Sequence, residues 1–169
     1  MGFITPGKTA EDSLKYDIQS AFIYKFIKFI EWDNPKHGFD NGNICVSVLG
    51  KGAINKSIKK INGKEVKGKK IDLWFIESIN ELKECKVLFI PPESNFNSSY
   101  KLDYLSSKGV LTIGNQRNFN KIGGIINLVT IKNKINFEIN LEQARKSNIK
   151  ISSKLLQLAR IVKNGNSRE

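Results

Sequence analysis

The chain has 169 residues, a length that fits one domain with its own hydrophobic core. Its composition is 40% hydrophobic, and no apolar run approaches the roughly 18 residues that a membrane-spanning helix requires. The formal net charge is +12, but lysine supplies 24 of the 28 basic residues. Domains that bind nucleic acids rely on arginine and on stacked aromatic side chains. We therefore expect no nucleic-acid partner, and a basic nucleic-acid-binding domain ranks last among the alternative functions.

The N-terminal segment predicts one long helix, which begins at Asp12 or Ser13 and ends at about Glu31. A second apolar row, Ile23 and Ile27, accompanies the main row of this helix. Two rows indicate a helix covered on more than one side, either by the sheet of its own domain or also by a second copy of the chain. The main row comprises Leu14, Ile18, Ala21, Phe22, Phe26, Phe29 and Ile30.

We divide the chain into three parts. Residues 1–12 are expected to be a disordered N-terminus or the remnant of a tag, residues 13–163 a single domain, and residues 164–169 a flexible tail. The first residues, MGFITPGKTAED, contain no signal peptide, which taken alone indicates a cytoplasmic protein.

Six strands are predicted after the first helix. Helical segments separate the first four strands, an alternation typical of parallel βαβ units. The short turn at 132–134 indicates that the last two strands form a hairpin. The predicted fold is an α/β three-layer sandwich, with a mostly parallel five- to six-stranded sheet, an antiparallel edge hairpin and helices on both faces. The predicted strands are 44–49, 71–76, 86–90, 109–113, 125–129 and 135–140.

The C-terminal segment is predicted to hold a short helix, 141–146, capped by Asn140, and a last helix from Lys154 to about Lys163. The last helix has a wide apolar arc. The core stripe of this helix leaves Leu156 and Ile161 on its two flanks. The helix is therefore either buried on several sides within its own domain or part of an oligomer or partner surface. The stripe comprises Leu155, Leu158, Ala159 and Val162.

Polar residues beside these flanks complete a candidate partner-binding set. Gln157 and Arg160 adjoin the apolar flanks. Glu138 lies inside the preceding strand and is expected either to face solvent or to pair with Arg145 or Arg160. As an alternative to this structural role, Glu138 and Arg145 are also counted in the partner-binding set.

The sequence contains few residues that could form a catalytic, metal-binding or ligand-binding site. The single histidine, His37, lies in a Gly/Asn/Asp-rich loop without a metal-ligand spacing, so neither a metal site nor a catalytic triad is predicted. The Gly50-Lys51-Gly52 junction between a strand and a helix is a possible anion site, although a tight turn explains it more simply. Cys45 and Cys85 each begin a predicted strand, either as free thiols or as a pair. We expect no enzyme and no cofactor.

Six stretches occur in a characteristic order along residues 13–162. They are AFIYKFIKFIEW, ICVSVLG, CKVLFI, GVLTIGN, GGIINLV and, at the end, FEIN followed by a short helix and ISSKLLQLARIV. Together they resemble the YfiR-like family of periplasmic repressors.

The resemblance implies a non-enzymatic periplasmic regulator. Such a protein binds the periplasmic domain of an inner-membrane diguanylate cyclase and represses it, which tunes cyclic-di-GMP signalling and biofilm formation. The resemblance further implies sequestration by an outer-membrane lipoprotein, removal of a signal peptide, and a disulfide between Cys45 and Cys85.

Two further expectations accompany this function. The surplus apolar surface of the first and last helices predicts a homodimer. An alternative function is a periplasmic small-molecule or anion-binding sensor that uses Lys150 and Ser152, or Gly50 and Gly52.

Overall fold

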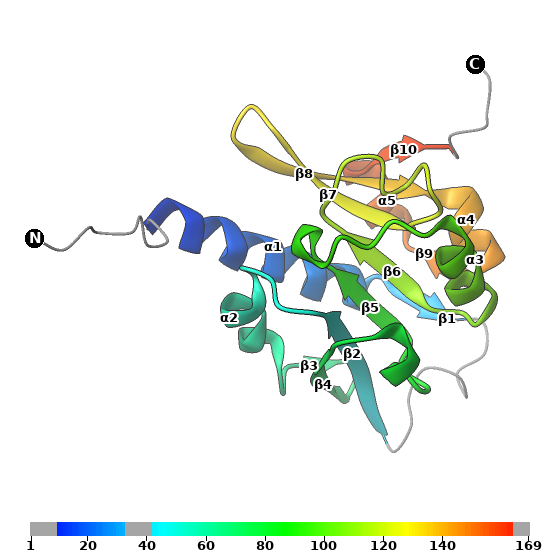
Figure 1. Cartoon of the computed structure of the whole chain (residues 1–169), viewed down its shortest axis with the longest axis horizontal. Helices are drawn as coiled ribbons and strands as arrows, with labels where there is room; N and C mark the ends of the chain where they lie inside the picture. Colours follow the sequence, from blue (N-terminus) through cyan, green and yellow to red (C-terminus); the bar gives the residue numbers. More distant parts are fainter. Residues whose placement is uncertain (1–9, 33–41, 164–169) are drawn as a thin grey trace, which may run out of the picture.

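An eight-stranded sheet organises the computed structural model, which describes residues 10–32 and 42–163. The strand order is β10-β8-β7-β6-β5-β2-β4-β3, and the pairs from β7 to β4 are all parallel (Figure 1). The strands are β2 (Asn43–Leu49), β3 (Glu65–Val66), β4 (Lys69–Ile76), β5 (Val87–Ile90), β6 (Leu111–Gly114), β7 (Ile126–Ile131), β8 (Lys134–Asn140) and β10 (Arg160–Val162). The predicted α/β fold is confirmed.

Helices and single 3-10 turns connect and cover the strands. The α-helices are α1 (Ala10–Lys28), α2 (Asn55–Ile58), α3 (Ser99–Ser107), α4 (Leu141–Lys146) and α5 (Ser153–Leu158). The 3-10 turns are η3 (Lys59–Ile61), η4 (Ile79–Glu81) and η5 (Pro92–Ser94). A small second sheet pairs β1 (Ile30–Trp32) antiparallel with β9 (Ile149–Ile151).

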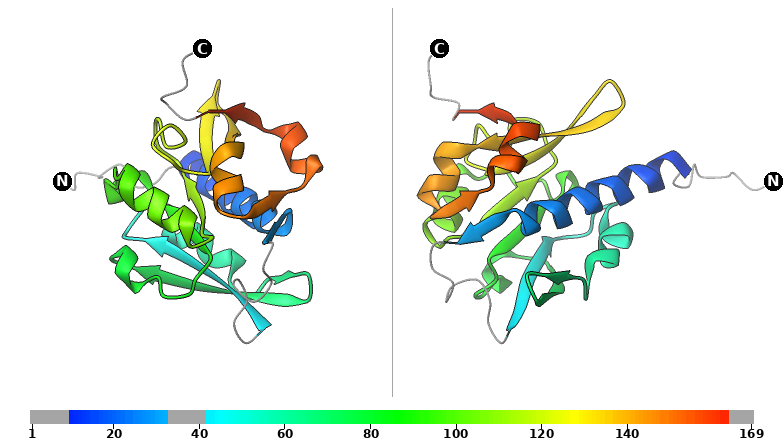
Figure 2. Two further views of the ribbon diagram at one scale, coloured as in Figure 1. Left: turned by 90° about the vertical axis from the view of Figure 1, so that its right-hand side faces the viewer. Right: turned by 180° about the vertical axis from the view of Figure 1, so that it is seen from behind.

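Two apolar clusters lie on the two faces of the sheet. The larger one joins α1 and α2 to the sheet and contains Phe26, Ile58 and Phe137. The smaller one lies beneath α3 and contains Leu102, Leu105 and Phe119. Figure 2 shows α1 crossing one face of the sheet and α3 lying on the other. This arrangement is the three-layer sandwich that alternating strands and helices predict.

The first helix differs from its prediction in extent and in its buried row. It begins at Ala10, so residues 10–12 are helical and do not belong to a disordered N-terminus. It ends at Lys28, and β1 follows because this strand pairs with β9 near the other end of the chain. Ile23 and Ile27, the row expected to be surplus, are fully buried in the large cluster.

The last predicted helix is shorter than expected, and its final residues form a strand. Helix α5 ends at Leu158, and Ala159 is already extended, with φ −91° and ψ 152°. The β-branched pair Ile161-Val162 then runs parallel to β8. This strand covers the outer side of the last three residues of β8, which a continued helix would leave unpaired. The β7–β8 hairpin is therefore one strand in from the edge that the sequence predicted for it.

Candidate partner-binding surface

The β8–α4 junction, which begins the C-terminal signature, is fixed by buried side-chain amides. The Asn140 Oδ1 accepts from the Gln143 backbone N–H at 3.1 Å, which caps α4 as predicted. The Asn140 Nδ2 donates to the Asn120 carbonyl at 3.0 Å. The Gln143 Nε2 in turn donates to the Ser106 Oγ at 2.8 Å. All four residues are buried, so this network ties β8, α3 and α4 into one rigid unit.

An ion pair connects the last strand to this unit. Arg160 lies opposite Glu138 in the β10–β8 register, and its Nη1 is 3.7 Å from the Glu138 Oε2. The Glu138 side chain is 19% exposed, whereas that of Arg160 is 70% exposed. Of the two partners predicted for Glu138, the structure selects Arg160. Arg145 lies exposed in the last turn of α4, where its charge favours the carboxyl end of the helix.

The apolar residues of the last segment are arranged differently from the predicted stripe. Leu155 is fully buried, as expected, but Leu158, which was expected in the core, is 59% exposed. Leu156, which was expected on an exposed flank, is half-buried against the large cluster. Ile161 is 47% exposed, on β10 instead of on a helix. The six-residue helix causes this difference, because residues beyond Leu158 no longer follow helical spacing.

The exposed and partly exposed residues at this end of the sheet are the apolar Leu158 and Ile161 and the polar Gln157, Arg160 and Glu138. We call these five residues the β10 surface. In the β10–β8 register, Arg160 and Glu138 lie on one face of the sheet edge and Ile161 lies on the other. Gln157 is exposed beside Leu158. Exposed apolar side chains among polar and charged ones have the composition of a protein interface.

A second exposed apolar row lies on α1. Leu14 is 60% exposed and Ile18 is 40% exposed, while Ala21 continues the same row one turn later. The sequence assigned these residues to the main buried row. They are exposed because the N-terminal half of α1 extends past the sheet (Figure 1). Helical periodicity alone does not show where a helix leaves the core, so this surface was missed.

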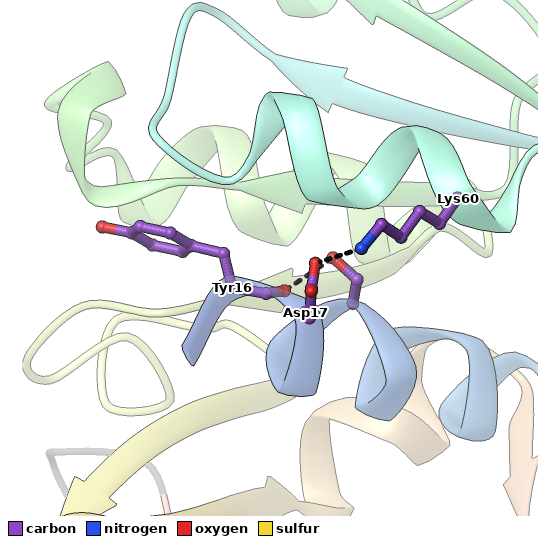
Figure 3. Close-up of polar contacts among 4 residues, drawn as sticks. Tyr16, Asp17 and Lys60 are labelled. Atoms are coloured by element: carbon purple, nitrogen blue, oxygen red, sulfur yellow. Dashed lines mark hydrogen bonds and ion pairs between the residues drawn. The ribbon is translucent and has the colours of Figure 1, made fainter. Parts of the chain in front are cut away.

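Next to this row, α1 is tied to the α2–η3 segment by an ion pair. The Lys60 Nζ is 2.9 Å from the Asp17 Oδ1 (Figure 3). Hydrogen bonds from Lys60 and then from Ser57 hold the pKa of the Asp17 carboxyl below its usual value. The first turns of α1 are thereby held against the domain by polar contacts, which leaves their apolar row to face outward.

The two predicted ligand sites use their polar groups within the fold. Glu93 accepts from the Ala53 N–H at 3.4 Å, and the Asn55 side chain bonds both Gly50 and Gly52. An anion at this turn would therefore displace a carboxylate, and α2 has only four residues. The Ser152 Oγ caps α5 by accepting from the Lys154 N–H at 3.2 Å. Lys150 is exposed on β9 opposite Glu31. Both ligand sites stay predictions.

Cys45 and Cys85 form the disulfide that the family resemblance implies. Their Cα atoms are 5.0 Å apart, and the bond joins β2 to the segment before β5. A groove of about 570 Å³ lies beside the disulfide, with Trp74, Ile76 and Leu82 in its walls. Within the described residues, His, Cys, Asp and Glu side chains do not gather into a group that would hold a metal ion. His37 lies outside the described residues.

Comparison with protein families decides the assignment of the chain. Residues 16–160 match the model of a family described as YfiR/HmsC-like, DUF4154. The chain belongs to the YfiR/HmsC-like family. The family is a periplasmic, regulatory one, and the matched range includes the disulfide, α1 from Tyr16 onward and Arg160 of the β10 surface. Among residues 10–32 and 42–163, no helix has the length and apolar character needed to cross a membrane.

Solved structures support the fold but not a particular role. No curated protein matches the chain. One similar structure is the ABC domain in complex with L-Trp from Streptococcus pneumonia, with a TM-score of 0.52 and 10% sequence identity. The match covers 87% of this chain and 60% of that one, so this chain spans less than two thirds of the other. At this identity, the likeness concerns the fold alone.

Proposed function

We propose that this protein is a non-enzymatic periplasmic repressor of an inner-membrane diguanylate cyclase. It binds the periplasmic domain of the cyclase through the β10 surface and holds the enzyme inactive, which lowers cyclic-di-GMP and biofilm formation. An outer-membrane lipoprotein that sequesters the repressor releases the cyclase. Membership in the YfiR/HmsC-like family supports this role.

The observation that carries the proposal is the exposed apolar pair within the family's C-terminal signature. Leu158 and Ile161 are large aliphatic side chains that their own domain does not bury. Asn140 and the buried amides around it hold the strand beside them rigid, so binding costs little conformational entropy. An anchor of this kind in the centre of an interface contributes about 2 kcal/mol or more to binding.

The test combines binding with a cellular readout. The purified protein is titrated against the isolated periplasmic domain of a cyclase encoded beside it, and cyclic-di-GMP is measured in cells with and without the gene. We expect saturable binding and a rise in cyclic-di-GMP when the gene is deleted. Binding should change little with salt, because apolar anchors are not screened, whereas an anion or nucleic-acid ligand would dissociate steeply. Unchanged cyclic-di-GMP in the deletion strain would refute the repressor role.

We also propose that the protein forms a homodimer, with the exposed row of α1 at its centre. Leu14, Ile18 and Ala21 form one stripe on a helix that extends past the sheet. A stable dimer buries about 1,600 Å² in total. Light scattering at high micromolar concentration should give twice the mass of the chain, and Ile18→Glu should return the monomer mass. A wild-type monomer at that concentration would contradict the proposal.

A further inference from the structure

The outer edge of β4 is covered along its first half only. Ile71 exchanges two backbone hydrogen bonds with the 63–64 turn, because its carbonyl accepts from Gly63 and its N–H donates to Lys64, each at 2.8 Å. Two residues later, the Leu73 N–H donates to the Asn62 Oδ1 at 3.0 Å, so this side chain takes the place of a strand carbonyl. Beyond Leu73, the neighbouring chain no longer follows the edge.

The second half of this edge carries backbone groups that point away from the sheet. The Ile76 carbonyl accepts from Gly50 on the β2 side, so the alternation of the strand directs Phe75 to the open side, as it does Leu73. Within the described part of the chain, no group bonds the Leu73 carbonyl or the N–H and carbonyl of Phe75. Three consecutive outward groups are therefore available to a further strand.

Two aromatic side chains flank these open groups, one on each face of the sheet. Trp74 is 56% exposed and Phe75 is 41% exposed. The Trp74 Nε1 donates to the Asp72 Oδ2 at 2.9 Å, which fixes the ring as a wall of the groove beside the disulfide. Soluble proteins protect an open strand edge with charges, prolines or bulges, because aromatic residues beside it promote pairing with another chain.

The charge on the Phe75 face of this edge selects the occupant, whereas the groove on the Trp74 face is lined by Asp72, Glu81 and Glu84. The stretch 51–70 contains eight lysines and a single acid, Glu65. Lys60 and Lys67 are paired with carboxylates, whereas Lys56 and Lys59 are exposed and form no ion pair among the described residues. The Lys59 Nζ lies 5.9 Å from the centroid of the Phe75 ring. A second copy paired here would bring these lysines against their own counterparts, so an acidic chain is the better complement.

We infer that the open edge of β4, from Leu73 to Ile76, binds an extended acidic segment of a partner protein as an added strand. The backbone of the partner segment forms hydrogen bonds with the three outward groups of β4. The side chains of the segment alternate between acidic and apolar. Carboxylates lie beside Lys59 on one face, and apolar side chains pack on Trp74 on the other. This site goes beyond the proposed repressor contact, because β10 and β4 lie at opposite ends of the sheet.

The test uses a blocked synthetic peptide of about eight residues that alternates valine and glutamate. Binding is followed by the fluorescence of Trp74 in a Trp32→Phe background, which removes the other tryptophan. We expect a blue shift that saturates with a dissociation constant below roughly 1 mM, and slower hydrogen exchange at the Phe75 amide. A peptide with lysine in place of glutamate should bind at least about ten-fold more weakly.

Matched variants separate the contributions that the Phe75 backbone N–H, the Phe75 ring and the Lys59 charge make to peptide binding. Phe75→Ala removes the ring and keeps the outward N–H, while Phe75→Pro removes both at a position where an edge strand tolerates proline. Phe75→Pro should bind about five-fold more weakly than Phe75→Ala. Lys59→Gln should weaken binding about two- to three-fold, whereas Lys134→Gln, at the exposed start of β8, should not.

Three results would overturn the inference. The first is equal binding of the valine–glutamate and valine–lysine peptides, or no binding of either at millimolar concentration. The second is unchanged exchange at the Phe75 amide in the complex, a measurement that stands even when Phe75→Pro fails to fold. The third is binding of anionic phosphatidylglycerol vesicles that depends on Lys59 and displaces the peptide, which would identify a lipid surface.

Discussion

The two ends of the eight-stranded sheet are finished in different ways. At one end, Arg160–Val162 covers β8 along three residues, and an ion pair between Arg160 and Glu138 holds the added strand. At the other end, β3 and Asn62 cover β4 only as far as Leu73, and two aromatic residues stand beside the remaining open groups. At the β10 end, the outermost strand is a three-residue segment with exposed side chains. At the β4 end, open backbone groups of an eight-residue strand lie between two exposed aromatic side chains.

The difference shows how short a segment can cover part of a strand edge. Three residues cover the last three positions of β8, because they follow directly from a six-residue helix that returns the chain to the sheet. The β4 edge has a longer segment beside it, but that segment is rich in lysine and turns away. Lysine on an edge is a common protection against aggregation, and it also limits which chain can approach.

The largest expected effect concerns the β4 end. Replacing both Cys45 and Cys85 with alanine removes a bond that closes a 40-residue separation. In the chain-entropy description, the free energy of unfolding should fall by about 4 kcal/mol. Urea denaturation of the double variant measures this loss, and wild-type protein in reductant should unfold in the same range. Equal stability of the oxidised and reduced proteins would show that the β4 end does not need the disulfide.

The next effect concerns the anchored end. Asn140→Ala leaves the Gln143 N–H and the Asn120 carbonyl without their buried partner. The free energy of unfolding should fall by about 2–3 kcal/mol. Asn136→Ala, at an exposed position of the same strand, is the matched control and should change stability by less than about 0.5 kcal/mol. If both variants unfold at the same urea concentration, the buried network does not rigidify the β10 surface.

The smallest effect concerns the attachment of α1. The folded-state pKa of Asp17 is lowered by Lys60, so its stabilising effect is present above the unfolded pKa of about 3.9 and is lost as the pH falls through the folded pKa. Asp17→Asn should therefore melt slightly below wild type at about pH 7 and together with it at about pH 2. A difference in melting temperature that persists in acid would mean that the ion pair with Lys60 is not its source.

The sequence predicted the sheet well because its strands carry strong local signals. All six predicted strands are present, and Asn140 caps α4 as expected. The Cys45–Cys85 disulfide came from the family resemblance, and the structure contains it. These features depend on residues that are close in sequence or on a pattern shared by the whole family.

Apart from β3, which has only two residues and pairs with the nearby start of β4, the strands that the sequence missed have partners that are distant in the sequence. β1 and β9 are three residues each and pair across most of the chain, so neither has a local pattern of its own. Arg160–Val162 continued a helical pattern in the sequence and became a strand because β8 needed a neighbour. Because the helix ends early for this reason, Leu156 is half-buried and Leu158 is exposed, which is the opposite of what the sequence predicted. The open edge of β4 was not predictable, because it depends on where the 62–64 turn leaves that strand.

The most direct test of the account is the affinity of a Leu158→Ala, Ile161→Ala double variant for the periplasmic domain of the cyclase. Both side chains are largely exposed in the free protein, so the variant should melt with wild type. Its affinity should fall by about 30-fold or more, while Ile131→Ala, exposed on β7, should bind like wild type. A folded double variant that binds the cyclase with wild-type affinity would contradict the assignment of the β10 surface as the repressor contact.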